Sequence, residues 1–438
     1  MTVGSGISPS NCGGTLLADA PWLRRPATRR VLAALEAEGG VGCVRFVGGC
    51  VRNALIGQAV DDIDMATRLT PEAVMAALKS AGIKVVPTGL AHGTVTAVAD
   101  RIPHEITTLR RDIETDGRRA VVAFTEDWAE DAARRDFRLN ALYADGDGVV
   151  FDPTGHGLAD ARSGRIVFVG DAETRIREDY LRILRFFRFF AWYGRDEPDA
   201  AGLAACAALG GGMTQLSAER VSRELLKLLA APDPGPALTA MAAAGVLSHV
   251  LFEARPLEGV ISMIALSTDP VLRLSMLLPG DTATIEAAAR CLRLSNPVRD
   301  RLLAASASLD LGMQARAARA LIYRIGAPAF ADRVVRAQAS VGGEQRRAGV
   351  DLLSLARDWT PPRLPIGGRQ VAAAGVPPGP ETGRILAAFE AGWIADDFPG
   401  QGHAERLNAL VLAQEIVSPD PPPDPSAGPP PGPPASDA

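Results

Sequence analysis

Two aspartates in an Asp-x-Asp spacing, Asp62 and Asp64, stand shortly after a pair of glycines, Gly48 and Gly49. Residues two apart on a strand project to the same face, so this spacing predicts two carboxylates side by side. Like charges that close are costly unless a cation lies between them. The glycines let backbone N–H groups approach a phosphate, and the helix expected next offers its N-terminus to the same anion. This stretch therefore predicts a phosphate cradle beside a divalent-metal site, the minimum needed to move a nucleotidyl group.

Short elements must position these residues. An apolar strand at 44–47 leads into the glycine turn, a helix follows at 50–56, and a second strand carries both aspartates. Thr70 and Pro71 mark a helix start, with Thr70 as N-cap and Pro71 in the first helical position. The other expected elements are helices over 27–37 and 70–79 and strands over 83–86, 94–98 and 105–109. This alternation of strands and helices predicts an α/β or α+β head domain.

A third carboxylate, Glu105, falls on the last of these strands, where alternation puts Glu105, Thr107 and Leu109 on one face. On a strand next to the aspartates, Glu105 would supply a third metal ligand or a base for an attacking hydroxyl. Taken alone, an exposed strand glutamate is the simpler interpretation. The charged segment that follows, 110–128, carries a Thr-Asp-Gly turn signal at 115–117 and fits either a mobile flap over the site or an ordinary hairpin.

An arginine pair and an aspartate, Arg134, Arg135 and Asp136, come next, with Asn140 one turn further on. Arginines close to a phosphate site can clamp a triphosphate bidentately, and an aspartate among them can accept a hydrogen bond from a ribose hydroxyl. The alternative is a surface charge cluster, which is a common feature. The Pro- and Gly-rich loop at 152–160 ends the sheet region and could serve as a hinge.

The strongest helical pattern in the chain covers 177–193. It has apolar stripes at helical spacing, and Asp179, Arg182 and Arg185 follow one another at three-residue steps along another side. An aspartate and an arginine one turn apart can present an acceptor and donors to the edge of a nucleobase. The alternative is an ion pair within the helix on a solvated face. Beyond Gly194 the patterns predict helices only.

Together these motifs resemble the class II tRNA nucleotidyltransferase family, which holds the CCA-adding enzymes and bacterial poly(A) polymerases; the chain is most like a bacterial CCA-adding enzyme. The resemblance runs from about Trp22 to about Phe252. It implies a five-stranded mixed head sheet followed by an all-helical neck, body and tail. It also implies that Asp62 and Asp64 bind Mg²⁺ and that Glu105 is a supporting catalytic carboxylate. The positions that match the family's nucleotide-binding motifs are Gly48, Gly49, Arg52, Arg134, Arg135, Asp136, Asn140, Asp179, Arg182 and Arg185.

Three positions depart from the family's pattern. Asn53 stands where many members have an aspartate, which leaves Asp62 and Asp64 to carry the metal role. His156 takes the place of the second glycine usual in the hinge, so motion of that loop is expected to differ. Arg138 replaces a more usual threonine, outside the contacts on which the resemblance depends.

The resemblance implies a template-independent enzyme that adds C, C and then A to the 3′ ends of tRNA from CTP and ATP, with release of pyrophosphate. A poly(A) polymerase, or an enzyme that adds only CC or only A, would share the same motifs. A non-catalytic tRNA-binding protein that keeps the fold is an alternative of a different class. The intact pair Asp62 and Asp64 argues against it.

Composition sets the outer limits. The 438 residues, 47% apolar and 22% charged, can bury a large core in two to four domains. A net charge of −5 argues against non-specific coating of nucleic acid, yet residues 290–347 hold eleven arginines against four acidic residues. A phosphate-backbone contact surface requires such an asymmetry, and an arginine-rich base composition would also produce it. The five scattered cysteines indicate neither a disulfide framework nor a zinc site, so we expect a cytoplasmic setting. We expect no membrane span, and no protein partner is evident.

The domain organisation follows from these patterns. We expect a flexible N-terminus at 1–25, a nucleotidyltransferase head at 26–152, a helical neck for nucleotide recognition and RNA binding at 153–255, a helical body and tail at 256–417, and a disordered Pro-rich tail at 418–438.

Overall fold

The computed structural model describes residues 17, 19–116 and 119–415. The chain forms two compact units, Met1–Ser308 and Leu309–Ala438. The expected boundaries after residues 152 and 255 both fall inside the first unit. Most of the expected flexible N-terminus, 1–25, and the whole Pro-rich tail, 418–438, lie outside the described residues.

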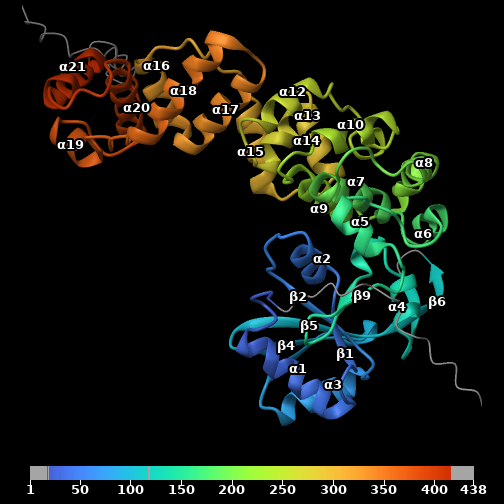
Figure 1. Ribbon diagram of the computed structural model, residues 1–438. Coiled ribbons are helices and arrows are strands. Elements are labelled where there is room, and N and C mark those ends of the chain that lie inside the picture. Colours follow the sequence, from blue (N-terminus) through green and yellow to red (C-terminus); the bar gives the residue numbers. More distant parts are fainter. Residues whose placement is uncertain (1–16, 18, 117–118, 416–438) are drawn as a thin grey trace, which may run out of the picture. The chain divides into compact units, whose positions relative to one another are not determined.

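A seven-stranded mixed sheet forms the head of the first unit, in the order β3-β4-β5-β2-β1-β8-β9 (Figure 1). Its strands are β1 (Val44–Val47), β2 (Ile63–Thr67), β3 (Lys84–Gly89), β4 (Thr94–Ala99), β5 (Ile102–Thr108), β8 (Tyr143–Ala144) and β9 (Val150–Phe151). β2 and β5 run parallel, and the other neighbouring strands run antiparallel. The mixed sheet is confirmed, but the expected five strands are extended by β8 and β9, which have two residues each.

Two helices of the head, α1 and α3, lie together on one face of this sheet, and α4 packs against the other. The head helices are α1 (Pro26–Gly39), α2 (Gly49–Leu55), α3 (Pro71–Ser80) and α4 (Trp128–Ala133). Figure 1 shows α1 and α3 together on the same face. His104 of β5 lies on that face, because its Nε2 is 3.1 Å from the Thr28 hydroxyl of α1. The Thr70 hydroxyl accepts a hydrogen bond from the Ala73 N–H, which confirms the predicted helix start.

Two residues expected on strands, Asp62 and Leu109, lie just outside them. Asp62 lies just before β2 rather than on it, because the ladder with β5 starts at Ile63. Leu109 lies beyond the end of β5 and joins a buried cluster with Ala66 and Tyr143. Ala66 is two residues from Asp64 on β2, so this cluster lies on the face that carries Asp64 and Glu105, as alternation predicts. The charged segment forms a two-stranded hairpin, the second of its two interpretations. Its strands are β6 (Arg110–Asp116) and β7 (Arg119–Phe124).

The rest of the first unit is helical. Its helices are α5 (Gly157–Ser163), α6 (Ala172–Glu178), α7 (Leu181–Tyr193), α8 (Ala200–Leu209), α9 (Ala218–Leu229), α10 (Gly235–Ala243), α11 (Leu247–Val250), α12 (Glu258–Ile264), α13 (Pro270–Leu277), α14 (Thr282–Cys291) and α15 (Asn296–Ser306). A 3-10 helix, Gly210–Gln215, separates α8 from α9. Arg273 of α13 is fully buried and donates hydrogen bonds to the carbonyls of Leu229 and Ala231, so it fixes the end of α9.

The single helix expected over 177–193 is interrupted. Asp179 has extended backbone angles, φ −156° and ψ 105°, which end α6, and α7 starts two residues later. One oxygen of the Asp179 carboxylate accepts a hydrogen bond from the Leu181 N–H at 3.1 Å. Aspartate favours such local bonds over a continuous helix, so its side chain caps the second segment.

The expected hinge loop is partly helical as well, because α5 begins at Gly157. The Asp152 carboxylate accepts hydrogen bonds from the N–H groups of Thr154, Gly155 and Leu158, which fasten the loop to itself. A Cβ on Gly157 would lie 2.4 Å from the carbonyl oxygen of Arg138, so this close approach requires glycine.

All the secondary structure in the described residues of the second unit, 309–415, is helical. Its helices are α16 (Ala315–Ile325), α17 (Ala327–Ala339), α18 (Gly343–Asp358), α19 (Gly368–Ala373), α20 (Pro380–Ala395) and α21 (His403–Glu415). One core gathers around Phe330 and Val334, and a second gathers around Phe389 and Trp393. Across the described part of the chain, every helix is too short or too polar to cross a membrane.

Candidate active site

Two of the predicted carboxylates meet on neighbouring strands. Asp64 of β2 and Glu105 of β5 are register partners in the parallel pair, so their side chains leave the same face of the sheet. This face is opposite the one that His104 shares with α1. Glu105 and Asp62 are exposed, whereas Asp64 is partly buried. The structure thus pairs Asp64 with Glu105, and Asp62 stands two residues before Asp64 in the loop that leads into β2.

The charge around Asp64 is unfavourable for a carboxylate. Burial raises its pKa to about 6, and the neighbouring carboxylates of Glu105 and Asp62 act in the same direction. Arg135 and Arg52 act in the opposite direction without cancelling the shift. A divalent cation between the acidic groups would relieve this repulsion.

The donor set fits magnesium in chemistry. Mg²⁺ in such sites is held by one or two carboxylates and by the oxygens of substrate phosphates, with water completing the octahedron. Asp62 and Asp64 can supply the protein's share. Among the described residues, no three or more His, Cys, Asp and Glu side chains are grouped so that they could hold a metal ion by themselves. Other ligands, such as the oxygens of a bound triphosphate, would therefore complete the coordination.

The glycine turn lies next to two arginines. Gly48 has a φ of 72°, a left-handed conformation that favours glycine. A Cβ added to Gly48 would lie 3.8 Å from Arg135 Nη1, and one added to Gly49 would lie 3.8 Å from Arg52 Nη2. Two guanidinium groups therefore flank the turn predicted to receive phosphate.

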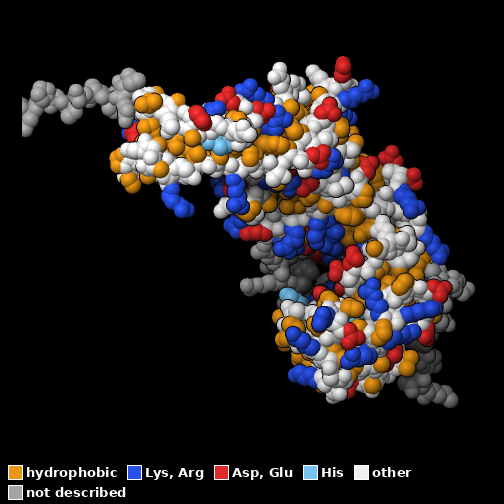
Figure 2. All heavy atoms as spheres, turned by 90° about the vertical axis from the view of Figure 1, so that its left-hand side faces the viewer, with side chains coloured by type: hydrophobic (Ala, Val, Ile, Leu, Met, Phe, Trp, Pro, Cys, Tyr) orange, Lys and Arg blue, Asp and Glu red, His pale blue; other side chains and the backbone are white. Residues whose placement is uncertain are grey.

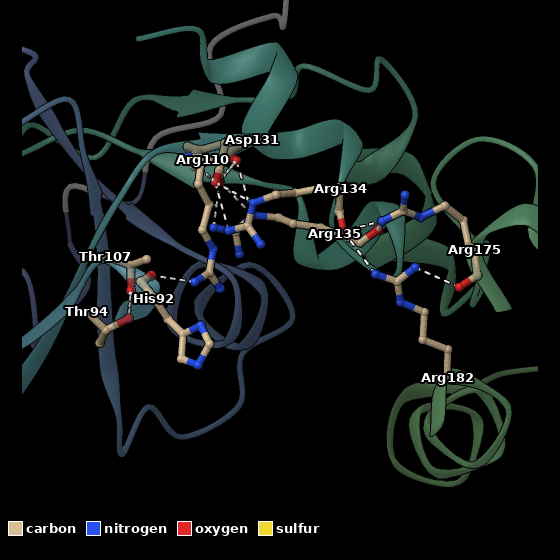
Figure 3. Close-up of polar contacts among 10 residues, drawn as sticks. His92, Thr94, Thr107, Arg110, Asp131, Arg134, Arg135, Arg175 and Arg182 are labelled. Atoms are coloured by element: carbon tan, nitrogen blue, oxygen red, sulfur yellow. Dashed lines mark hydrogen bonds and ion pairs between the residues drawn. The ribbon is translucent and has the colours of Figure 1, made fainter. Parts of the chain in front are cut away.

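A buried aspartate organises the arginine pair. Asp131 of α4 is 1% exposed, and its two oxygens form ion pairs of 2.9 Å with Arg134 and Arg135 (Figure 3). The Tyr143 hydroxyl donates to the same carboxylate at 2.7 Å and accepts from Arg135 Nε at 3.1 Å. Burial alone would raise the pKa of Asp131, but the two arginines lower it to about 2. Asp131 is therefore ionised and holds both guanidinium groups in place.

A chain of side chains links the glycine turn to α7. Arg52 of α2 donates to the amide oxygen of Asn140, and the Asn140 amide nitrogen donates to Asp136 at 3.0 Å. Asp136 also accepts from Arg185 Nε of α7 at 2.9 Å. Burial would raise the pKa of Asp136, but the Arg185 charge and these hydrogen bonds hold it well below its usual range. Arg52 further stacks 4.0 Å from the ring of Tyr193.

The predicted base-reading residues have partners of their own. Arg182 donates to Glu178 and, at 2.7 and 3.2 Å, to the carbonyls of Arg175 and Arg134 (Figure 3). Asp179 instead forms a 2.6 Å ion pair with Arg220 of α9. The alternative interpretation, an ion pair of Asp179 with Arg182 on a solvated face of one helix, is therefore wrong: Arg182 pairs with Glu178 across the break between α6 and α7, and both side chains are largely buried.

The surface around these residues is positively charged. Figure 2 shows Lys and Arg side chains gathered in the hollow between the head and the helices that follow it. Positive charge in a concave surface attracts anions such as a triphosphate or an RNA backbone.

Sequence reasoning missed several residues of this network. Asp131 precedes Arg134 and Arg135 by three and four positions, a helical ion-pair spacing that could have revealed it. Tyr143, Tyr193 and Arg220 reach the site from separate elements, and no local pattern marks them.

Comparisons with known proteins agree with this geometry. Residues 44–167 match the family described as "Poly A polymerase head domain". Residues 199–256 match the family described as "Probable RNA and SrmB- binding site of polymerase A". The mitochondrial CCA tRNA nucleotidyltransferase 1 of Homo sapiens is 45% identical over 192 residues, which are 42% of this chain and 43% of that protein. This chain is related to the class II tRNA nucleotidyltransferases.

Bacterial members of the class II tRNA nucleotidyltransferases match as well. The CCA-adding enzyme of Geobacillus kaustophilus is 38% identical over 209 residues, 47% of this chain and 50% of that enzyme. The chain thus spans about half the length of these relatives in sequence. The solved Bacillus stearothermophilus CCA-adding enzyme in complex with CTP has a TM-score of 0.71 at 25% identity, over 90% of this chain and 98% of that one. These matches confirm the resemblance and the fold class, an α+β head followed by helices.

Proposed function

We propose that this protein is a template-independent nucleotidyltransferase that adds C, C and then A to tRNA 3′ ends. CTP and ATP would be the substrates, and pyrophosphate would leave. The observation that carries the proposal is the register pairing of Asp64 with Glu105, on the sheet face where Arg135 approaches the Gly48 turn. Paired carboxylates beside a phosphate-binding turn are the arrangement that nucleotidyl transfer requires.

The reaction would be an in-line attack of the tRNA 3′-hydroxyl on the α-phosphorus of the nucleotide. Asp62 and Asp64 would hold Mg²⁺, which supplies positive charge for the triphosphate when bound. Glu105, beside them on β5, would accept the proton of the attacking hydroxyl or support the metal ligands. The raised pKa of Asp64, about 6, still leaves it mostly ionised at neutral pH.

The arginines would bind the triphosphate. Arg135 and Arg52 flank the turn of Gly48 and Gly49, and Asp131 keeps Arg135 oriented. A fixed guanidinium loses little entropy when it binds an anion, so its contribution to affinity is large. Asp136 and Asn140, one step further along the same network, would contact the ribose.

Nucleotide choice would come from Asp179 and Arg182. Cytosine and adenine both carry an exocyclic amino group that donates to a carboxylate, whereas uracil and guanine carry a carbonyl oxygen at the same place. One aspartate can therefore accept both substrates and reject the other two. Arg182 would donate to a ring nitrogen or carbonyl acceptor of the same base.

Other assignments remain part of this proposal. The segment 152–160 would act as the hinge between head and neck, and residues 153–255 with the helices beyond them would bind tRNA. The matched RNA-binding family over 199–256 supports this placement. A cytoplasmic location is proposed from the cysteine pattern. Some relatives are named as mitochondrial CCA tRNA nucleotidyltransferases.

One incubation series tests the proposal. Purified protein receives a tRNA that lacks its 3′ CCA, with CTP alone, ATP alone, or both, and the products are sequenced. The proposal requires CC addition from CTP alone and CCA addition from both nucleotides. Long A tails from ATP alone would instead identify a poly(A) polymerase, and products limited to CC or to a single A would identify a partial enzyme. Binding of tRNA without release of pyrophosphate would leave only a non-catalytic RNA-binding protein.

A further inference from the structure

Asp179 is held at both oxygens of its carboxylate. One oxygen accepts the Leu181 N–H at 3.1 Å, and the other accepts Arg220 Nη2 at 2.6 Å. The side chains of Asp179 and Arg220 are 26% and 30% exposed, so a ligand can still reach them. Each carboxylate oxygen has a second lone pair, and these remain available as acceptors.

A separate ion pair joins α9, the helix that carries Arg220, to α7. Glu224, one turn after Arg220 on α9, is 7% exposed and forms a 2.5 Å ion pair with Arg188 of α7. The end of α9 is fixed by the buried Arg273. Because two ion pairs and a buried anchor set the position of α9, the Arg220 guanidinium is a rigid support rather than a mobile surface group.

The backbone beside Asp179 is supported independently. The ring of Tyr180 lies directly against Gly212 of the 3-10 helix, where an added Cβ would be 2.0 Å from a ring carbon. The segment from Gly212 to Arg220 therefore contacts the break between α6 and α7 at two consecutive residues. Arg182, the other proposed base-reading residue, is anchored from the opposite side by the carbonyl of Arg134 (Figure 3).

We propose that Arg220 is a specificity-determining positioning residue, which holds the Asp179 carboxylate in one orientation toward the nucleobase. This inference rests on the proposed function. A carboxylate fixed in this way presents acceptors only, so it bonds to the amino groups of cytosine and adenine and repels the carbonyl oxygens of uracil and guanine. A carboxylate without Arg220 rotates about its side-chain bonds and turns away from a mismatched carbonyl, so UTP is no longer rejected.

Arg220→Gln tests this role with the full-length protein. We expect the ratio of kcat/KM for CTP over UTP to fall about tenfold. The gain should appear as a higher kcat/KM for UTP, whereas a merely structural defect would lower both values together. The matched control is Arg177→Gln, which removes the 2.6 Å ion pair to Glu173 on α6, two residues from Asp179 but pointing to solvent. This control should keep the wild-type ratio and the wild-type thermal midpoint.

A double-mutant cycle shows whether Arg220 acts through Asp179. If it does, Asp179→Asn with Arg220→Gln has the same CTP/UTP ratio as Asp179→Asn alone, because the second change has nothing left to orient. Additive losses, or an Arg220→Gln protein that discriminates as well as the wild type, would overturn the positioning role. A wild-type protein that incorporates no nucleotide into tRNA would instead overturn the proposed function, so the two failures are distinguishable. Equilibrium binding of CTP and UTP to Arg220→Gln measures discrimination in ground-state binding, without turnover, and covers a variant with weak catalysis.

Discussion

Arg52 on α2 and Asn140 in the 3-10 helix Arg138–Asn140 are joined by a hydrogen bond between buried side chains, 6% and 7% exposed. Through Asn140 the guanidinium beside Gly49 is connected to Asp136 and from there to Arg185 of α7. The turn predicted to bind phosphate and the helix predicted to read the base are therefore parts of one network.

Removal of this link should be measurable as lost stability. Asn140→Ala leaves a buried charged donor without its acceptor, which costs about 2 kcal/mol and should lower the thermal midpoint of the first unit by about 4 °C. Asn53→Ala is the matched control. Asn53 accepts from the same guanidinium at 2.8 Å but at a partly exposed position, where water can replace it. Equal shifts of the thermal midpoint in the two variants would show that the buried bond from Arg52 to Asn140 contributes no more stability than the partly exposed bond to Asn53.

Asp64 should be essential for catalysis and dispensable for tRNA binding. Asp64→Ala removes one of two proposed Mg²⁺ ligands, so nucleotide incorporation should fall by about a thousandfold or more. Affinity for tRNA, measured by filter binding, should change less than twofold, because the proposed tRNA-binding surface lies on the helices rather than on β2. Asp61→Ala is the control, because it removes an exposed carboxylate that precedes β2 and has no proposed metal role. Its nucleotide incorporation should stay near the wild-type level. Turnover that survives in Asp64→Ala would refute the metal assignment.

The raised pKa of Asp64 also predicts a dependence of stability on pH. The folded protein binds this proton with a pKa of about 6 against an ordinary value of 3.8, so the folded state holds more protons between these values. Stability of the metal-free protein therefore falls as pH rises from 4 to 6, and the penalty is fully present above pH 6.

Asp64→Asn removes that penalty. We expect it to raise the unfolding free energy by on the order of 2 kcal/mol at pH 8 and by almost nothing at pH 4. Addition of Mg²⁺ at pH 8 should raise the thermal midpoint of the wild type and leave the variant unchanged. An equal response of both proteins to Mg²⁺ would contradict the proposed site. Scanning calorimetry at the two pH values, with and without the metal, supplies all of these comparisons.

Asp131 should be worth more to stability than any exposed ion pair. Asp131→Asn leaves Arg134 and Arg135 without their buried partner, a change that costs about 3–5 kcal/mol. Glu173→Gln breaks the exposed pair with Arg177 and should cost about 0.5 kcal/mol or less. Because the pKa of Asp131 is lowered to about 2, its contribution is complete above pH 4 and is lost as the pH falls toward 2. Urea unfolding of both variants at pH 7 and pH 3 checks the ranking.

Local patterns predicted the elements of the head well. The apolar run before Gly48, the cap at Thr70 and the alternation around Glu105 are short-range signals, and the structure has strands and a helix where they lie. The pairing of β2 with β5 was considered only as a condition for a catalytic role of Glu105, because a parallel ladder between distant segments leaves no local trace. The break at Asp179 was missed, since the apolar stripes on both sides of it keep the helical period.

The residues proposed to act on the substrate could be named from the sequence, but the residues that hold them in position could not. Carboxylates and arginines that act on a substrate occur in short motifs, so Asp64, Glu105 and Arg135 could be named from the sequence. The residues that hold them, such as Tyr143 and Arg220, come from elements that meet only in the folded chain. Their choice depends on tertiary distance and burial, and neither quantity can be read from spacing.

The parallel pairing of β2 and β5 also decides when acidic charge accumulates during folding. β3 and β4 lie between them in the chain, and β5 is bonded to β4 on its other side, so the ladder of β2 with β5 is a long-range contact. Asp64 and Glu105 stay apart in any chain in which this ladder has not formed. The proposed cation site therefore depends on a long-range strand pairing and would report, through metal affinity, whether the sheet of the head is complete.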